Sequence, residues 1–361
     1  MAMTRAAAAT HSHRHLKRVL SILGVVLLVG ALALILRTLS AGGSFTQVRP
    51  GYLGRCALAA RLAVRDITVD AKTGLAFLAV AAPKPVAEDG IYLADPSHPQ
   101  APPQRLGGVP PGFRATALSL WRGQNGELML FAASPGPISG SIDIFSVHLG
   151  AHPRLIETAD IGSSLFAHVR ALVALNAGRF YAVDAPHVAD DFFSLLGSYL
   201  TPAKGRIIFY DGQIAHVVAK DLRAPRGLAL APDGSKLYVG LAVSRVLASY
   251  KIEPFLGRLT LVDRYPLPLA PGAFTLDGKH ALLIAGDPKL FDRARFEHDP
   301  SHPSPSAVVR VELSGGLPHG VSQIYADLGR PISAAGVAVK AGGHLLIGSA
   351  LASRLISCTP T

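Results

Sequence analysis

A recurring unit of short apolar runs around a glycine turn constrains the fold of this chain most. The unit is clearest over residues 221–250, where three apolar runs follow one another and a Pro-Asp-Gly turn at 232–234 separates the first two. Proline presets φ at the second position of a turn, and glycine accepts a positive φ that other residues resist. Three short strands within about thirty residues predict an antiparallel meander.

The same pattern recurs at a spacing of roughly fifty residues, which is in the range of propeller blades. Its six turns contain Gly74, Gly126, Gly178, Gly234, Gly278 and Gly343. We therefore predict an all-β fold, a six-bladed β-propeller over residues 54–361. A single β-sandwich is the alternative, but such domains usually end near about two hundred residues.

The composition indicates a large folded core. Of the 361 residues, 49% are hydrophobic and 16% are charged, and 36 glycines with 27 prolines suit a turn-rich β-protein. The net charge of +11 allows an acidic partner. Because the Lys and Arg residues are scattered and few aromatic residues lie between them, the sequence does not indicate a nucleic-acid partner.

An uncharged run from Val19 to Leu36 follows a basic segment, residues 1–18. Its length just reaches the span of a hydrocarbon core, so we predict a transmembrane signal anchor over 19–36 and a tether over 37–53. More basic residues precede the run than follow it, which predicts a cytoplasmic N-terminus and a propeller on the periplasmic, lumenal or extracellular side. A cleaved signal peptide is the alternative.

Two cysteines, Cys56 and Cys358, stand near the two ends of the predicted propeller. In an oxidising compartment the simplest interpretation is one disulfide bond, which would lock the two ends of the ring together. Two free thiols are the alternative.

One segment departs from the β pattern. Residues 189–200, ADDFFSLLGSYL, begin with two acids, which suit a helix start, and their apolar residues cover most of one side. We predict a short amphipathic helix that packs on the propeller, with a lid or a membrane-contacting surface as the alternative role. His187, Asp190 and Asp191 have the chemistry of metal ligands, but a helix cap with solvated acids is the simpler interpretation.

The order of these features resembles the paraoxonase/arylesterase family, which belongs to the gluconolactonase-like six-bladed propellers. The resemblance rests on VVAKDLRAPRGLALAPDGSKLYVG at 217–240, FYAVDAPHV at 180–188 and GHLLIGSALASRLISC at 343–358, and covers roughly residues 54–358. The paired terminal cysteines and the N-terminal apolar segment also match. The resemblance implies a calcium-dependent ester or lactone hydrolase, with calcium held in the propeller tunnel by carboxylates and amides.

The positions that hold calcium in that family carry other residue types here. By the resemblance, an acidic pair corresponds to Arg65-Asp66, an Asn-Asp pair to Arg170-Ala171, an Asn to Arg226, and an Asp-Asn pair to Pro271-Gly272. Calcium takes about six to eight oxygen ligands, and among these side chains only Asp66 offers one. We therefore expect that the family's calcium has been lost and that the chain has no other cofactor.

The catalytic histidine pair of the family is replaced as well. The two corresponding positions hold Thr116 and Ser134. A hydroxyl is a poor general base because its pKa is far from neutral. The resemblance thus leaves the catalytic residues unassigned.

Three arginines, Arg65, Arg170 and Arg226, are expected at one mouth of the tunnel, on the face of Thr116 and Ser134. Their guanidinium groups offer a rigid fork for carboxylate or phosphate, with Asp66 and Asp184 as counter-charges. We predict a pocket for an anionic small molecule or an acidic partner. Arginine–acid pairs that plug an inactive tunnel are one alternative, and an active arylesterase or lactonase with a remodelled site is another.

Overall fold

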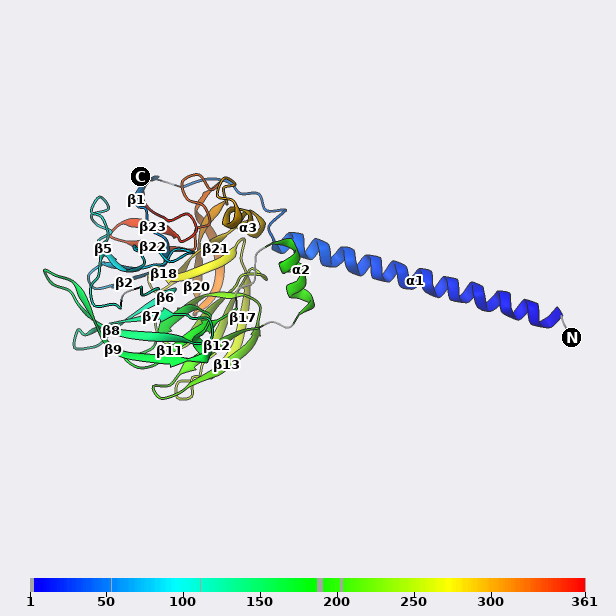
Figure 1. Cartoon of the computed structure of the whole chain (residues 1–361), viewed down its shortest axis with the longest axis horizontal. Helices are drawn as coiled ribbons and strands as arrows, with labels where there is room; N and C mark the ends of the chain where they lie inside the picture. The colour runs from blue at the N-terminus through cyan, green and yellow to red at the C-terminus, as the bar shows by residue number, and fades with distance from the viewer. Residues whose placement is uncertain (1–2, 53, 111, 187–190, 202–203, 361) are drawn as a thin grey trace.

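The computed structural model describes residues 3–52, 54–110, 112–186, 191–201 and 204–360. Its folded part is a ring of six four-stranded antiparallel sheets. A long N-terminal helix projects from one side of this ring (Figure 1). The prediction of a six-bladed β-propeller is confirmed.

Within five sheets, or blades, the strands run in chain order from the innermost to the outermost. The first blade contains β2 (Val64–Val69), β3 (Ala76–Val80), β4 (Gly90–Ala94) and β5 (Gln104–Arg105); the second, β6 (Ala117–Arg122), β7 (Leu128–Ser134), β8 (Gly140–His148) and β9 (Arg154–Ser163); and the third, β10 (Val169–Ala174), β11 (Phe180–Asp184), β12 (Gly205–Tyr210) and β13 (Ala215–Leu222). The fourth contains β14 (Pro225–Leu230), β15 (Lys236–Leu241), β16 (Val246–Ile252) and β17 (Leu259–Pro266), and the fifth, β18 (Ala270–Leu276), β19 (Ala281–Asp287), β20 (Ser306–Ser314) and β21 (Leu317–Asp327). The sixth contains β22 (Val337–Ala341), β23 (His344–Ser349), β24 (Arg354–Pro360) and β1 (Gly54–Ala60).

The predicted glycine turns connect the first strand of each blade to the second. At five of them φ lies between 69° and 87°, in the region that favours glycine. These five are Gly74, Gly126, Gly234, Gly278 and Gly343. The sixth, Gly178, precedes β11 without a positive φ.

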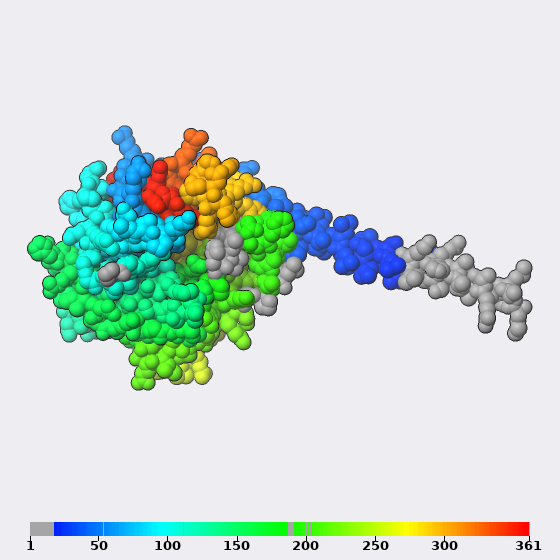
Figure 2. Space-filling view, viewed as in Figure 1, coloured from blue at the N-terminus to red at the C-terminus, as the bar shows by residue number. Residues whose placement is uncertain are grey.

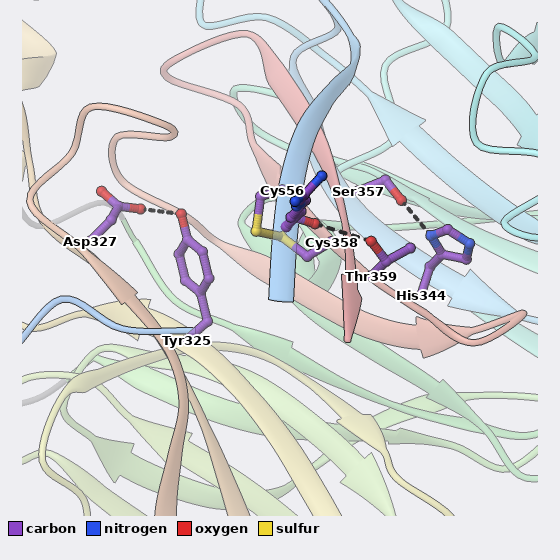
Figure 3. The surroundings of a disulfide bond; sticks show 8 residues. Cys56, Tyr325, Asp327, His344, Ser357, Cys358 and Thr359 are labelled. Carbon is purple, nitrogen blue, oxygen red and sulfur yellow. Dashed lines mark hydrogen bonds between the residues drawn. A yellow bond between two sulfur atoms is a disulfide. The ribbon is translucent and has the colours of Figure 1, made fainter. Parts of the chain in front are cut away.

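The chain closes its ring by pairing the first propeller strand with the last. Strand β1 lies antiparallel to β24, with Cys56 directly opposite Cys358. The two cysteines form a disulfide bond with a Cα–Cα distance of 4.0 Å (Figure 3). The predicted disulfide is confirmed, and it joins strands at the outer edge of the sixth blade.

The core lies between neighbouring blades. Between the second and third, for example, the side chains of Phe131, Phe166 and Phe180 are fully buried. The rings of Phe131 and Phe180 meet edge to face, with centroids 6.1 Å apart. Full burial of each such side chain stabilises the fold by roughly 2–3 kcal/mol, so this packing holds adjacent blades together.

The N-terminal helix α1 (Met3–Ala41) is longer than the predicted membrane span. Its segment Arg18–Ala41 is long and apolar enough to cross a membrane, and none of that segment's most apolar window is buried. The helix continues past Leu36, where the sequence placed the end of the span, and Thr38 is already fully buried. The apolar part therefore stands clear of the propeller while the C-terminal end is packed on it.

Two short helices lie on the side of the ring from which α1 leaves (Figure 1). The predicted amphipathic helix is present as α2 (Phe192–Leu200), with Asp191 as its N-cap; its start at 189 was predicted three residues early. The second, α3 (Leu290–His298), was not predicted, so the expectation of a single short helix was wrong. Its sequence has few apolar residues, and only Leu290, Ala294 and Phe296 are buried, which is too weak a pattern to distinguish it from a loop.

The segment that follows α1, within the predicted tether over 37–53, lies against the propeller. Gly51 exchanges backbone hydrogen bonds with Ala326 of β21. The Arg49 carbonyl accepts a bond from Gln323 Nε2, and Val48 packs against the apolar cluster between the fourth and fifth blades. These contacts hold the segment on the propeller surface, so the end of α1 stays close to the ring.

We expect that replacing Cys56 and Cys358 by serine lowers the free energy of unfolding by at most about 5 kcal/mol, because the bond closes a very long loop. Urea unfolding of the oxidised protein, the reduced protein and the double variant measures this. The reduced protein and the variant should unfold at the same, lower midpoint. Three equal midpoints would mean that the β1–β24 pairing closes the ring without covalent help.

Candidate functional site

A cavity of about 1030 Å³ occupies the axis of the ring. The innermost strands of all six blades contribute to its lining, namely β2, β6, β10, β14, β18 and β22. Five predicted site residues line it: Arg65, Asp66, Thr116, Arg170 and Arg226. The structure therefore brings together, from four blades, residues that are far apart in the sequence.

The three predicted arginines occupy equivalent positions in three inner strands. In β2 the register shifts between Val64 and Asp66, so that Arg65 is the extra residue of a β-bulge. Arg170 is the extra residue in β10, and Arg226 the extra residue in β14. A bulge redirects a side chain, which gives three blades the same means of presenting a guanidinium group to the axis.

Backbone carbonyls hold two of these groups in matching ways. Arg65 Nε donates to the Ala81 carbonyl at 2.7 Å, and Arg170 Nε donates to the Ala185 carbonyl at 3.3 Å. Ala81 and Ala185 each come directly after the second strand of their blade. The same kind of hydrogen bond therefore anchors the arginine in the first and third blades.

The third arginine meets an acid and a further arginine. Arg226 Nη1 lies 3.8 Å from Asp287 Oδ2, and Arg293 Nε of α3 lies 3.3 Å from the same oxygen. Arg293 also lies 3.8 Å from Glu297, one turn further along α3. Asp287, the last residue of β19, lines the cavity together with Arg293 and Glu297 of α3. The sequence interpretation missed all three, and it missed the two in α3 because it missed that helix.

The pKa of Arg65 shows how closely the positive charges are gathered. Burial lowers this pKa from its usual value, and the charges of Arg114 and Arg293 lower it further. Asp89 and Glu297 act in the opposite direction. Because like charges affect one another only at short range in a screened medium, the guanidinium groups of the first blade and of α3 share one electrostatic environment.

Asp66 is held at the cavity wall by two backbone groups. Its Oδ1 accepts a hydrogen bond from Ile67 N at 2.9 Å, and its Oδ2 accepts one from Leu118 N of the next blade at 2.8 Å. Burial nevertheless raises the pKa of Asp66 to about 7, against the effect of these two bonds. Near neutral pH this carboxyl group is therefore about half protonated.

Thr116 and Ser134 were expected on the face of the arginines. Thr116 lines the cavity and donates to the Val169 carbonyl at 3.0 Å, whereas Ser134, the last residue of β7, lies at the same end of the ring but is not among the described residues of the lining. Asp184 does not lie between the arginines of the cavity. It accepts bonds from Arg206 Nε and from the His168 backbone, at 2.9 and 2.8 Å.

The metal-like set beside α2 is only partly described. His187 and Asp190 lie outside the described residues. Asp191 accepts hydrogen bonds from the backbone and hydroxyl of Ser194, as a helix cap does.

The described cavity residues do not fit a calcium ion. Calcium takes about six to eight oxygen ligands. The carboxylates of the lining are those of Asp66, Asp287 and Glu297. Asp66 turns both oxygens to backbone N–H groups, and the other two acids face Arg293. These carboxylate oxygens already interact with other groups of the protein, and the neighbouring arginines would repel the ion.

A second acidic group lies away from the cavity. Asp143 of β8 and Glu157 and Asp160 of β9 have carboxylate oxygens within 4.8 Å of one another. Burial raises the pKa of Asp143 to about 6, and Ser141 donates a hydrogen bond to its carboxylate. The serine already partners the most buried of the three carboxylates.

The fold and cavity define a class, the six-bladed propellers with a ligand-sized hollow on the axis. The family model described as arylesterase matches residues 69–359. The chain therefore belongs to the arylesterase family, as the resemblance implied.

Curated relatives share about a quarter of their residues with the chain. Human serum paraoxonase/arylesterase 2 is 26% identical over 246 residues, which are 68% of each protein. The Caenorhabditis elegans mechanosensory abnormality protein 6 is 23% identical over 253 residues, 69% of this chain and 66% of that protein. The match thus spans about two thirds of either relative's length.

Solved structures agree on the architecture. A luciferin-regenerating enzyme superposes with a TM-score of 0.53 at 13% identity, covering 85% of this chain and 95% of its own. Regucalcin from Agrobacterium tumefaciens gives a TM-score of 0.52 at 11% identity, covering 86% and 95%. At these identities the likeness establishes the fold alone.

We expect ionisation of Asp66 to destabilise the folded protein. Its folded pKa of about 7 lies above the ordinary value near 4, so its contribution to stability is complete below about pH 4 and is lost as the pH rises through 7. The full loss is at most about 4 kcal/mol. Melting temperatures from pH 4 to 8 should therefore show Asp66→Asn gaining stability relative to the wild type as the pH rises.

Asp70→Asn is the matched control with the opposite sign. Burial opposes ionisation of Asp70, but hydrogen bonds from Arg122 and Thr73 hold its pKa below the ordinary value. Its contribution is present above about pH 4 and is lost as the pH falls further. This variant should therefore lose stability relative to the wild type between about pH 2 and 4, and run parallel to the wild type from pH 4 to 8. Parallel curves for the two variants would contradict the raised pKa of Asp66.

Proposed function

We propose that this chain is a membrane-tethered, arylesterase-like propeller whose axial cavity binds an anionic ligand or an acidic partner in place of the family's calcium. The observation that carries the proposal is the gathering of four arginines, from three inner strands and α3, in one cavity. Its charged lining comprises six basic and three acidic residues: Arg65, Arg170, Arg226, Lys279, Arg293 and Lys340 against Asp66, Asp287 and Glu297. Lys279 and Lys340 lie at the opposite end of the tunnel, where Lys340 Nζ is 2.9 Å from Asp277 Oδ2. At the mouth, four arginines therefore accompany three acids.

Chemistry and volume favour a ligand over a plugged tunnel. Arginine presents planar pairs of N–H groups that match the oxygens of carboxylate and phosphate. Ligand pockets usually measure about 300–1,000 Å³, and a volume of about 1030 Å³ remains at the axis with the arginines in place. Side chains that simply neutralised one another would fill the space with salt bridges.

The membrane tether and the extracytoplasmic side rest on two features. The helix segment Arg18–Ala41 meets the length and hydropathy of a membrane span. The disulfide between Cys56 and Cys358 is typical of oxidising compartments. With basic residues concentrated before the apolar run, the N-terminus lies in the cytoplasm and the propeller beyond the membrane.

An ester or lactone hydrolase is the second candidate, and Asp66 favours it. A carboxyl group with a pKa of about 7 can act as a general base near neutral pH, and it faces the same cavity. Hydrolysis of phenyl acetate or of an aliphatic lactone that is lost in Asp66→Asn would support this candidate. If the wild type hydrolyses neither compound, anion binding remains as the single candidate function.

Calcium should not stabilise the protein. A ligand at about a hundred times its dissociation constant adds roughly 2.7 kcal/mol to stability, whereas the cations of the cavity oppose calcium. Thermal unfolding of the full chain in detergent, with millimolar calcium and then with a chelator, measures this. A midpoint that rises by several degrees with calcium and falls again with chelator would show that a calcium site persists.

Anion binding should depend on the cavity arginines. We expect inorganic phosphate to bind the wild type at least tenfold more tightly than Arg226→Ala, which corresponds to about 1.4 kcal/mol. Isothermal titration calorimetry measures it. The matched control is Arg295→Ala on α3, because the Arg295 side chain is 72% exposed and does not line the cavity. Equal affinities in all three proteins would leave the plugged tunnel as the better account.

A further inference from the structure

The C-terminal end of the apolar helix is fixed to the propeller. Arg245, in the turn between β15 and β16, donates from Nε to the Ala41 carbonyl at 3.2 Å, and from Nη1 to Thr46 Oγ1 at 3.1 Å. Its Nη2 donates to the Pro288 carbonyl at 2.8 Å, just ahead of α3. One side chain therefore joins the end of α1, the following segment and the fifth blade.

This attachment leaves almost no distance between the membrane span and the propeller. The apolar run ends at Leu36, and Thr38, Gly42 and Gly43 are buried. At about 1.5 Å per residue, Leu36 and Ala41 are roughly 8 Å apart along the helix. The head-group layer on each side of a bilayer is about 5–8 Å thick. With residues 19–36 in the bilayer, the face that holds α1 therefore lies at the outer edge of the head-group layer.

The mouth of the cavity opens on that same face. The arginines stand where β2, β10 and β14 begin, which is the end of the ring where the second strands finish. Helix α3 links mouth and anchor directly: Gly42 packs against the Phe291 ring, and the Phe291 ring lies 6.1 Å from that of Phe192 in α2. Two residues further along α3, Arg293 lines the cavity.

Exposed apolar side chains from several elements lie at this end of the ring, and we call them the rim. Strand register places them on loops at the same end of the ring, in α2 or in the segment after α1. They are Phe45, Val86, Ile138, Phe193 and Leu328, with exposures from 47% to 83%. Figure 2 shows α2 and α3 side by side at the base of α1. Apolar side chains beside a positively charged cavity suit the surface of a lipid bilayer, whose interior is apolar and whose head groups carry negative charge.

We propose that the ligand of the cavity is the phosphate head group of a membrane lipid, presented by the bilayer in which α1 is embedded. This rests on the proposed anion site. The head group enters at the mouth beside α3 and reaches the arginines there, while its acyl chains stay among the apolar side chains of the rim. The chain thus takes its ligand from the membrane surface and not from the surrounding water.

The test uses the full chain in lipid nanodiscs that contain phosphatidic acid with a photoreactive group in its acyl chain. We expect its cross-linking to peptides of α2 and α3 to exceed that of photoreactive phosphatidylcholine at least fivefold. The Arg226→Gln and Arg293→Gln variants should each reduce the phosphatidic acid yield at least fivefold, provided that their melting temperatures show folded protein. Arg295→Gln, the exposed neighbour on the same helix, should change the yield less than twofold.

Binding of inorganic phosphate in discs of pure phosphatidylcholine separates the remaining outcomes. Phosphate binding that needs Arg226, together with lipid cross-linking that does not, would overturn the membrane source and leave the anion site standing. Equal losses in Arg293→Gln and Arg295→Gln would mean attraction by general surface charge and would also overturn the proposal. If neither phosphate nor phosphatidic acid depends on the cavity arginines, the anion site itself is wrong.

Discussion

The antiparallel pairing of β1 with β24 is the contact on which the rest of the structure depends. It completes the sixth blade with the first strand of the propeller, and the disulfide makes this connection covalent. Only a closed ring brings six inner strands around one axis, and only then do bulges in β2, β10 and β14 direct their side chains into a shared cavity. A site made from single residues of separate blades forms only when the ring is closed.

Gathering cations in such a cavity has an energetic cost, and the structure shows how that cost is reduced. Burial and like charges lower the pKa of Arg65, while Asp89 and Glu297 act against them. Asp287 faces two arginines at once. Burying a charge is costly unless it is paired, so the acids stabilise the empty site. An anion that bound there would stabilise it further, because the positive lining charges still exceed the negative ones.

Helix α3 connects the chemistry of the axis to the attachment of α1. Its Phe291 packs on Gly42, and its Arg293 lines the cavity. The two side chains lie on one short rigid element, so the orientation of the apolar helix and the shape of the mouth are determined together. A flexible tether would have separated them, whereas the Arg245 contacts and the Gly51–Ala326 pairing remove that freedom.

The sequence by itself determined the repeated meander, its glycine turns, the apolar helix, the disulfide partners and the three bulge arginines, because these depend on local patterns or on a family resemblance. Only the tertiary structure decided that α3 is a helix and that Arg293 lines the cavity. It also decided that Asp184 pairs with Arg206 and not with the cavity arginines. It also placed Thr116 in the lining and left Ser134 outside it. Such assignments depend on contacts between strands and helices that are far apart in the chain, and ring closure fixes these contacts where local periodicity does not.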